Sequence, residues 1–109
     1  MRNKYKIPLH IKNYVKNELY EYSKNKRRIK EIKSNDISTR TLLLATLKLQ
    51  KIDAVLNNLS KEEYKIAEKI FFERHNQVYM EMHYYISKDI YYNTMNKIIY
   101  LVALEFELI

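Results

Sequence analysis

The segment ISKDIYYNTMNK, residues 86–97, decides the fold that this sequence predicts. A short amphipathic stretch, residues 78–84, runs into it, and Ser87 can cap a new helix by accepting a hydrogen bond from a first-turn backbone N–H. A short helix, a tight turn and a longer Ser-capped helix are typical of a helix-turn-helix, whose second helix enters the DNA major groove. The same pattern also fits a simple N-cap in a helical bundle, so both interpretations stay open at this stage.

The amino-acid composition favours one fold class and a reducing compartment. The chain has 109 residues, the length of one domain (1–109), and contains no Gly, one Pro and no Cys. Without Gly, hairpins and Gly-rich phosphate loops are disfavoured, and apolar residues at helical spacing predict an all-α fold. The lack of Cys fits a reducing compartment, so we expect a cytoplasmic protein. No apolar run approaches the roughly 18 residues of a membrane span, and no signal peptide is recognisable.

Periodicity predicts a compact domain of five helices. Long N-terminal helices should span residues 8–33 and residues 38 or 39 to 56, and form a basic helical hairpin within residues 1–59. Residues 60–109 should form a helix-turn-helix-like region, with helices after Ser60, over 77–85 and over 88–106. The second of the long helices is apolar on more than one face. We therefore expect it to be buried on two sides, either at the centre of the fold or by a partner chain in a homodimer or heterodimer.

Local signals and stripes predict which side chains cap the helices and which pack inside. Ser60 and Glu63 have the spacing of a capping box, and Asn76 is the expected C-cap of the third helix. The stripes of the first, second, third and fifth helices predict these inward residues: Ile11, Val15, Leu19, Tyr22, Ile29 and Ile32; Leu42, Ala45, Leu49, Ile52, Leu56 and Leu59; Tyr64, Ala67, Ile70 and Phe71; Tyr91, Met95, Ile98, Leu101 or Val102, and Leu108.

Charge points to a polyanionic partner. Residues 1–52 hold 14 Lys and Arg against 4 Asp and Glu, a balance of +10, whereas residues 53–109 hold 6 against 9, a balance of −3. A basic half favours DNA, RNA or an anionic membrane surface, although a solvated helix face explains it equally well. The cations expected to hold phosphates or a partner lie on the first helix: Lys12, Lys16, Lys24, Arg27, Arg28 and Lys30.

The last helix supplies the residues expected to face DNA bases. Asn can bind adenine through N6 and N7, and Lys can bind guanine or phosphate. The outward, DNA-binding set is Lys88, Asp89, Tyr92, Asn93, Asn96 and Lys97. The charges of residues 77–97 nevertheless sum to zero, which is unusual around a recognition helix.

No catalytic or metal-binding constellation is recognisable. His10, His75 and His83 lie in different elements, and none has a His or Cys partner at metal-ligand spacing. The two carboxylates Glu62 and Glu63 are explained by the capping box and the helix dipole. We therefore expect no enzyme activity, no metal and no cofactor.

Several stretches of the chain resemble the phage late-gene transcriptional regulators of the ArpU/RinA type. Residues 9–20 resemble the opening helix of that family, residues 51–63 its junction between the second and third helices, and residues 86–92 with 97–105 its recognition helix and tail. The resemblance implies a C-terminal helix-turn-helix like that of sigma-factor region 4, duplex DNA as partner, and contact with RNA polymerase. Family members usually carry a basic residue where Asp89 stands and Arg or Lys near Asn93.

Two functional interpretations follow, from different classes. In the first, the chain is a DNA-binding transcriptional regulator of a phage or phage-related mobile element. In the second, it keeps a regulator-like fold but acts by protein–protein contact, as an antagonist or modulator of a late-gene activator. The basic first half favours DNA, and the near-neutral residues 77–97 favour protein contact. A basic amphipathic module on an anionic membrane is a third interpretation, supported by the first helix alone.

Overall fold

The computed structural model describes residues 5–31 and 39–109, with the side chain of Thr39 left out. Within these residues the fold is all-α, with five α-helices and no strand, which confirms the predicted fold class. The elements in chain order are α1 (Leu9–Glu31), α2 (Thr39–Asn57), α3 (Lys61–Ala67) with its π-helical continuation η1 (Glu68–Phe72), α4 (Gln77–Tyr84) and α5 (Lys88–Glu105).

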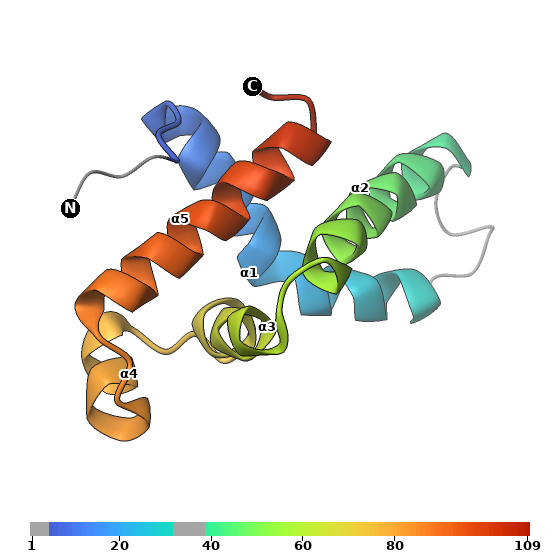
Figure 1. The fold of residues 1–109 in the computed structure, drawn as a ribbon. Helices are drawn as coiled ribbons and strands as arrows, with labels where there is room; N and C mark the ends of the chain where they lie inside the picture. Colours follow the sequence, from blue (N-terminus) through green and yellow to red (C-terminus); the bar gives the residue numbers. More distant parts are fainter. Residues whose placement is uncertain (1–4, 32–38) are drawn as a thin grey trace.

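Helix α5 is the centre of the arrangement (Figure 1). It packs against α1, α2, α3 and α4, and it buries more side chains than any other helix of the described chain. In Figure 1, α4 and α2 lie on opposite sides of the molecule, with α5 running between them and α1 crossing behind it. The expectation that the second helix might be the centre is therefore wrong, because α5 takes that place.

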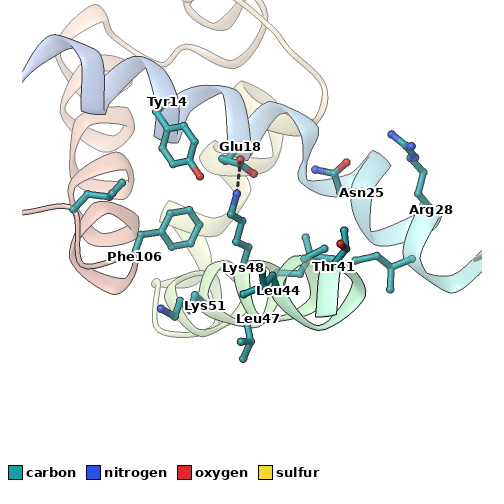
Figure 2. A pocket seen from close by; sticks show the side chains of 14 residues that line it. Tyr14, Glu18, Asn25, Arg28, Thr41, Leu44, Leu47, Lys48, Lys51 and Phe106 are labelled. Carbon is teal, nitrogen blue, oxygen red and sulfur yellow. Dashed lines mark hydrogen bonds and ion pairs between the residues drawn. The ribbon is translucent and has the colours of Figure 1, made fainter. Parts of the chain in front are cut away.

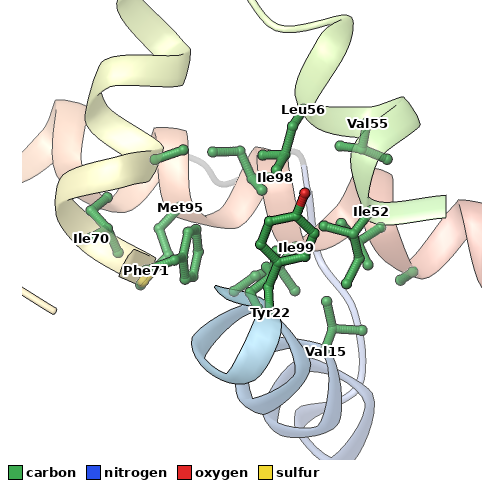
Figure 3. Close-up of a cluster of buried hydrophobic side chains, with 14 of the residues drawn as sticks. Val15, Tyr22, Ile52, Val55, Leu56, Ile70, Phe71, Met95, Ile98 and Ile99 are labelled. Carbon is green, nitrogen blue, oxygen red and sulfur yellow. The ribbon is translucent and has the colours of Figure 1, made fainter. Parts of the chain in front are cut away.

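One cluster of buried apolar side chains joins all five helices (Figure 3). Phe71, from η1, lies against Met95 of α5, while Ile52 of α2 faces Ile99 and Val15. The cluster consists of Val15, Leu19, Tyr22, Leu49, Ile52, Val55, Leu56, Ala67, Ile70, Phe71, Met80, Tyr91, Met95, Ile98, Ile99, Val102 and Ala103.

Helix α1 begins one residue later than predicted, at Leu9, because the Pro8 carbonyl accepts the first helical hydrogen bond, from Lys12 N at 3.0 Å. Its first half is buried at Val15, Leu19 and Tyr22. The expected end of the helix, near Lys33, and the inward residue Ile32 lie outside the described residues.

Lys26 lies within the apolar stripe of α1 because its ammonium group forms polar contacts that join α1 to α2. Its Nζ lies 3.5 Å from Asp53 Oδ1 and 3.2 Å from the Tyr22 hydroxyl, which in turn donates to Asp53. Burial and the bond to Asp53 raise the pKa of Tyr22, so this phenol stays a donor. The three side chains stabilise the crossing of α1 and α2.

Helix α2 is buried only in its C-terminal half. Leu49 and Ile52 are in the core, but Leu43, Leu44 and Leu47 are 58%, 55% and 42% exposed. The prediction that this helix is buried on two sides within the fold is therefore wrong for its first half. The physical reason is that neighbouring helices fully cover side chains of α2 only from Leu49 onward, while earlier positions such as Leu42 and Ala45 are partly buried.

The capping box of α3 is confirmed: Glu63 N donates to Ser60 Oγ, and Ser60 N donates to Glu63 Oε1, both at 3.1 Å. Asn76, however, is the N-cap of α4 and accepts from Tyr79 N at 2.8 Å, so its assignment as a C-cap is wrong. Arg74 ends the preceding turn instead, at φ 57°, a left-handed position that falls to a non-Gly residue in this Gly-free chain. Tyr64, predicted inside, is 38% exposed.

Helix α5 buries Tyr91, Met95 and Ile98 as predicted, and Val102 rather than Leu101 faces the core. The helix ends in a Schellman motif, with Leu108 N donating to Ala103 O at 2.9 Å and Glu107 N to Leu104 O at 3.0 Å. Leu108 therefore lies beyond the helix and is 37% exposed, which corrects its prediction as an inward residue.

Candidate functional site

Helices α4 and α5 form a helix-turn-helix unit. α4 has 8 residues, the turn consists of residues 85–87, and Ser87 caps α5 by accepting a hydrogen bond from Ile90 N at 3.2 Å. Met80 of α4 is fully buried, and its carbonyl accepts from Ile86 N at 3.3 Å, which holds the turn closed. The cap and the buried methionine together set the angle at which α5 leaves the turn.

The first two turns of α5 present a polar face to solvent. Lys88, Asp89, Tyr92 and Asn93 are exposed, as the helical stripe predicted. Tyr91 points the other way, is buried, and donates from its hydroxyl to the His75 carbonyl at 3.4 Å. The adjacent tyrosines thus divide into one core residue and one surface residue.

Lys97 forms an ion pair with a carboxylate of the same chain. Its Nζ lies 2.6 Å from Glu63 Oε2, so one carboxylate both completes the α3 capping box and anchors α5. The hydrogen bond to Glu63 raises the pKa of Lys97, and the same bond lowers the pKa of Glu63. Of the predicted DNA-binding set, Lys97 is thus the member that an internal ion pair already holds.

Asn96 is half-buried beneath the segment that precedes α1. It lines a hollow of about 100 Å³ together with Tyr5, Lys6 and Lys12, and the Tyr5 ring packs on Tyr100 with centroids 5.3 Å apart. The structure therefore brings Asn96, predicted to read a base, next to Lys12, predicted to hold a phosphate. The first two turns of α5 lie outside this hollow.

The six predicted phosphate-binding cations of α1 have different surroundings. Lys12 lines the hollow at α5, whereas Arg28 lines a different groove, between α1 and α2. Lys16 lies over the Tyr20 ring, 5.9 Å from its centroid, and Lys24 pairs with Glu21 at 3.9 Å. The remaining two, Arg27 and Lys30, are exposed on α1.

A stack of aromatic rings on α4 was not predicted. The Tyr79 ring lies between His75 and His83, with centroids 4.1 Å from each, and Lys69 lies 4.1 Å from the centroid of the neighbouring Tyr84 ring. His75 also contacts Glu73, at 3.2 Å. The four-residue spacing of positions 75, 79 and 83 is the signal that could have revealed the stack.

Over residues 5–31 and 39–109 no group of three His, Cys, Asp or Glu could hold a metal ion, and no polar or charged residue is fully buried. No helix in the same residues combines the length and apolar character needed to cross a membrane.

Comparisons of the chain with protein-family models, with curated proteins and with solved structures find no match.

Proposed function

We propose that the chain is a DNA-binding transcriptional regulator of a phage or phage-related mobile element, working in the cytoplasm of its bacterial host. One observation carries the proposal: α4, the turn at 85–87 and the Ser87-capped α5 form a helix-turn-helix unit whose second helix exposes polar side chains over its first two turns. A helix presented in this way fits the major groove, where its N-terminal residues meet base edges.

Each exposed side chain of α5 has a suitable partner in that groove. Asn93 can bind adenine N6 and N7, Lys88 can bind guanine or a phosphate, and Asp89 can accept from cytosine N4. Tyr92 can contact a thymine methyl group or stack on a base. Asn96 and Lys12, one turn further along, would meet the flanking backbone, and the other α1 cations would add contacts that carry no sequence information.

The test is a gel shift on the intergenic regions of the protein's own element, at two salt concentrations. Asn93→Ala should lose roughly 1–3 kcal/mol of discrimination against competitor DNA, because a bidentate contact to one base is lost. Asn57→Ala, at an exposed site at the end of α2, is the matched control and should leave discrimination unchanged. Neutralising Arg27 and Arg28 should weaken binding to all sequences alike and flatten the salt dependence.

A second candidate function is protein–protein antagonism, with the chain pairing with a related regulator or contacting RNA polymerase. It is favoured by the charge around α5: residues 77–97 are balanced, and the ion pair with Glu63 engages Lys97. If the protein shifts no DNA from its own element at low salt yet copurifies with a second regulator, this candidate replaces the first.

A further inference from the structure

A groove of about 630 Å³ runs between α1 and α2 and ends at the residues that follow α5 (Figure 2). Figure 2 shows Tyr14 and Phe106 at one end and Arg28 at the other, with Lys48 reaching across from α2 to Glu18 of α1. The apolar residues that line the groove are Ile29, Leu44, Ala45, Leu47, Leu49, Phe106 and Leu108.

The groove displays large apolar side chains to solvent. Leu44 and Leu47 are 55% and 42% exposed although both line it, and Leu108 is 37% exposed at its far end. Apolar surface gathered in this way gains free energy when a partner removes it from water. The groove is therefore a candidate docking surface rather than a gap between helices.

Its charged groups are mostly cations. Among the described residues, Arg28, Lys48 and Lys51 line the groove, against a single carboxylate, Glu18, which lies 3.4 Å from Lys48. A complementary occupant must therefore combine apolar side chains with carboxylates. Two copies that meet groove to groove do not satisfy this demand, because such a two-fold pairing would bring cations against cations.

The protein itself places such a sequence at the end of the groove. Residues 104–109 read LEFELI, in which acidic and apolar residues alternate. Phe106 and Leu108 line the groove, while Glu105 and Glu107 are exposed. The apolar side chains of this segment thus meet the groove, and its two carboxylates do not line it.

We propose that this groove docks an acidic amphipathic helix from a partner protein. Large apolar residues on one face of that helix would pack on Leu44 and Phe106, and its carboxylates would face Arg28 and Lys51, in the manner of a helix laid in a groove. The proposal does not depend on DNA binding, because the groove contains none of the exposed residues in the first two turns of α5, and Arg28 is the one residue that both proposals use.

The probe is a fluorescein-labelled synthetic helix of Glu and Ala with Leu and Phe along one face, followed by fluorescence anisotropy with the full chain. We expect saturable binding that weakens with salt, because the charges contribute to it. A scrambled peptide of the same composition and a peptide with Lys in place of Glu should each bind about tenfold more weakly or worse.

Two pairs of matched variants locate the binding. Leu44→Glu should weaken binding about tenfold, whereas Leu43→Glu, 58% exposed on the same helix but outside the groove, should change it less than about twofold. Arg28→Glu should weaken binding, and Arg27→Glu, with the same change of net charge, should not. All four sites are exposed, so thermal melting should confirm that each variant folds.

Three results would overturn the proposal. One is equal binding of the scrambled peptide, and another is an equal effect of Leu43→Glu and Leu44→Glu. The third is a concentration-dependent dimer that Leu44→Glu abolishes, which would make a second copy the occupant. A failed gel shift with peptide binding intact would count against the proposed DNA function alone.

Discussion

Truncation of α2 on its buried and exposed sides tests the packing most directly. Ile52 is 1% exposed and faces the centre of the core, whereas Leu43, nine positions earlier, is 58% exposed. Ile52→Ala removes buried methylene groups and leaves a cavity among well-packed neighbours. The expected cost is about 2–5 kcal/mol of unfolding free energy.

The same change at Leu43 should cost little. Its side chain already meets water, so truncation removes little buried surface, and Ala has a higher helix propensity than Leu. We expect an effect within about 0.5 kcal/mol. Against a total stability of roughly 5–15 kcal/mol for a domain, Ile52→Ala would remove a large share and Leu43→Ala almost none.

Urea denaturation followed by circular dichroism at the helical band measures both variants, with the slope checked for constancy. Leu49 is 9% exposed, so Leu49→Ala should lower the unfolding free energy by an amount similar to that of Ile52→Ala. A cost below about 1 kcal/mol at both Ile52 and Leu49 would refute the packing described for α2. If Leu43→Ala lowers the unfolding free energy strongly, but does so only at high protein concentration, a second copy of the chain covers the first half of α2.

The remaining predictions concern a charge and a turn. The pKa of Glu63 is lowered in the folded state from its ordinary value of 4.5, so its stabilisation is present above that value and is lost as pH falls through the folded pKa. When the pH is lowered from neutral to acidic, Glu63→Gln should therefore lose less stability in thermal melts than the parent protein does. Glu62→Gln is the control and should behave like the parent. Identical pH dependence for the parent and Glu63→Gln would contradict this prediction. Tyr85 has φ 56° and a 91% exposed side chain, so Tyr85→Gly should raise stability by about 1 kcal/mol, measured as a higher urea midpoint. A lower midpoint would show that the ring stabilises the turn.

The local features of this chain are readable in its sequence because they involve residues a few positions apart. The capping box of Ser60 and Glu63, the Ser87 cap and the inward face of α5 at Tyr91, Met95 and Ile98 all follow from helical spacing. The exposed polar face of α5 at Lys88, Asp89, Tyr92 and Asn93 follows from the same periodicity, since residues opposite a buried stripe meet solvent.

Even local chemistry left choices that only the surroundings decide. Asn76 can cap either end of a helix, and the left-handed turn at Arg74 settled that it begins α4. In the sequence, Leu108 continues the helical periodicity of α5, but the Schellman motif ends the helix before this residue. In both cases the sequence pattern is compatible with two backbones of similar local energy.

Tertiary structure alone decided which helix lies at the centre of the fold and which candidate DNA-binding side chains are already paired within the protein. The many apolar residues of α2 do not show whether a neighbour covers them, and the fold leaves Leu43, Leu44 and Leu47 exposed, the last two as lining of the groove between α1 and α2. Lys97 is a surface cation in the sequence, yet it meets Glu63, which lies 34 positions away. Helical period assigns a residue to a face of its own helix, but what that face meets depends on how distant helices pack.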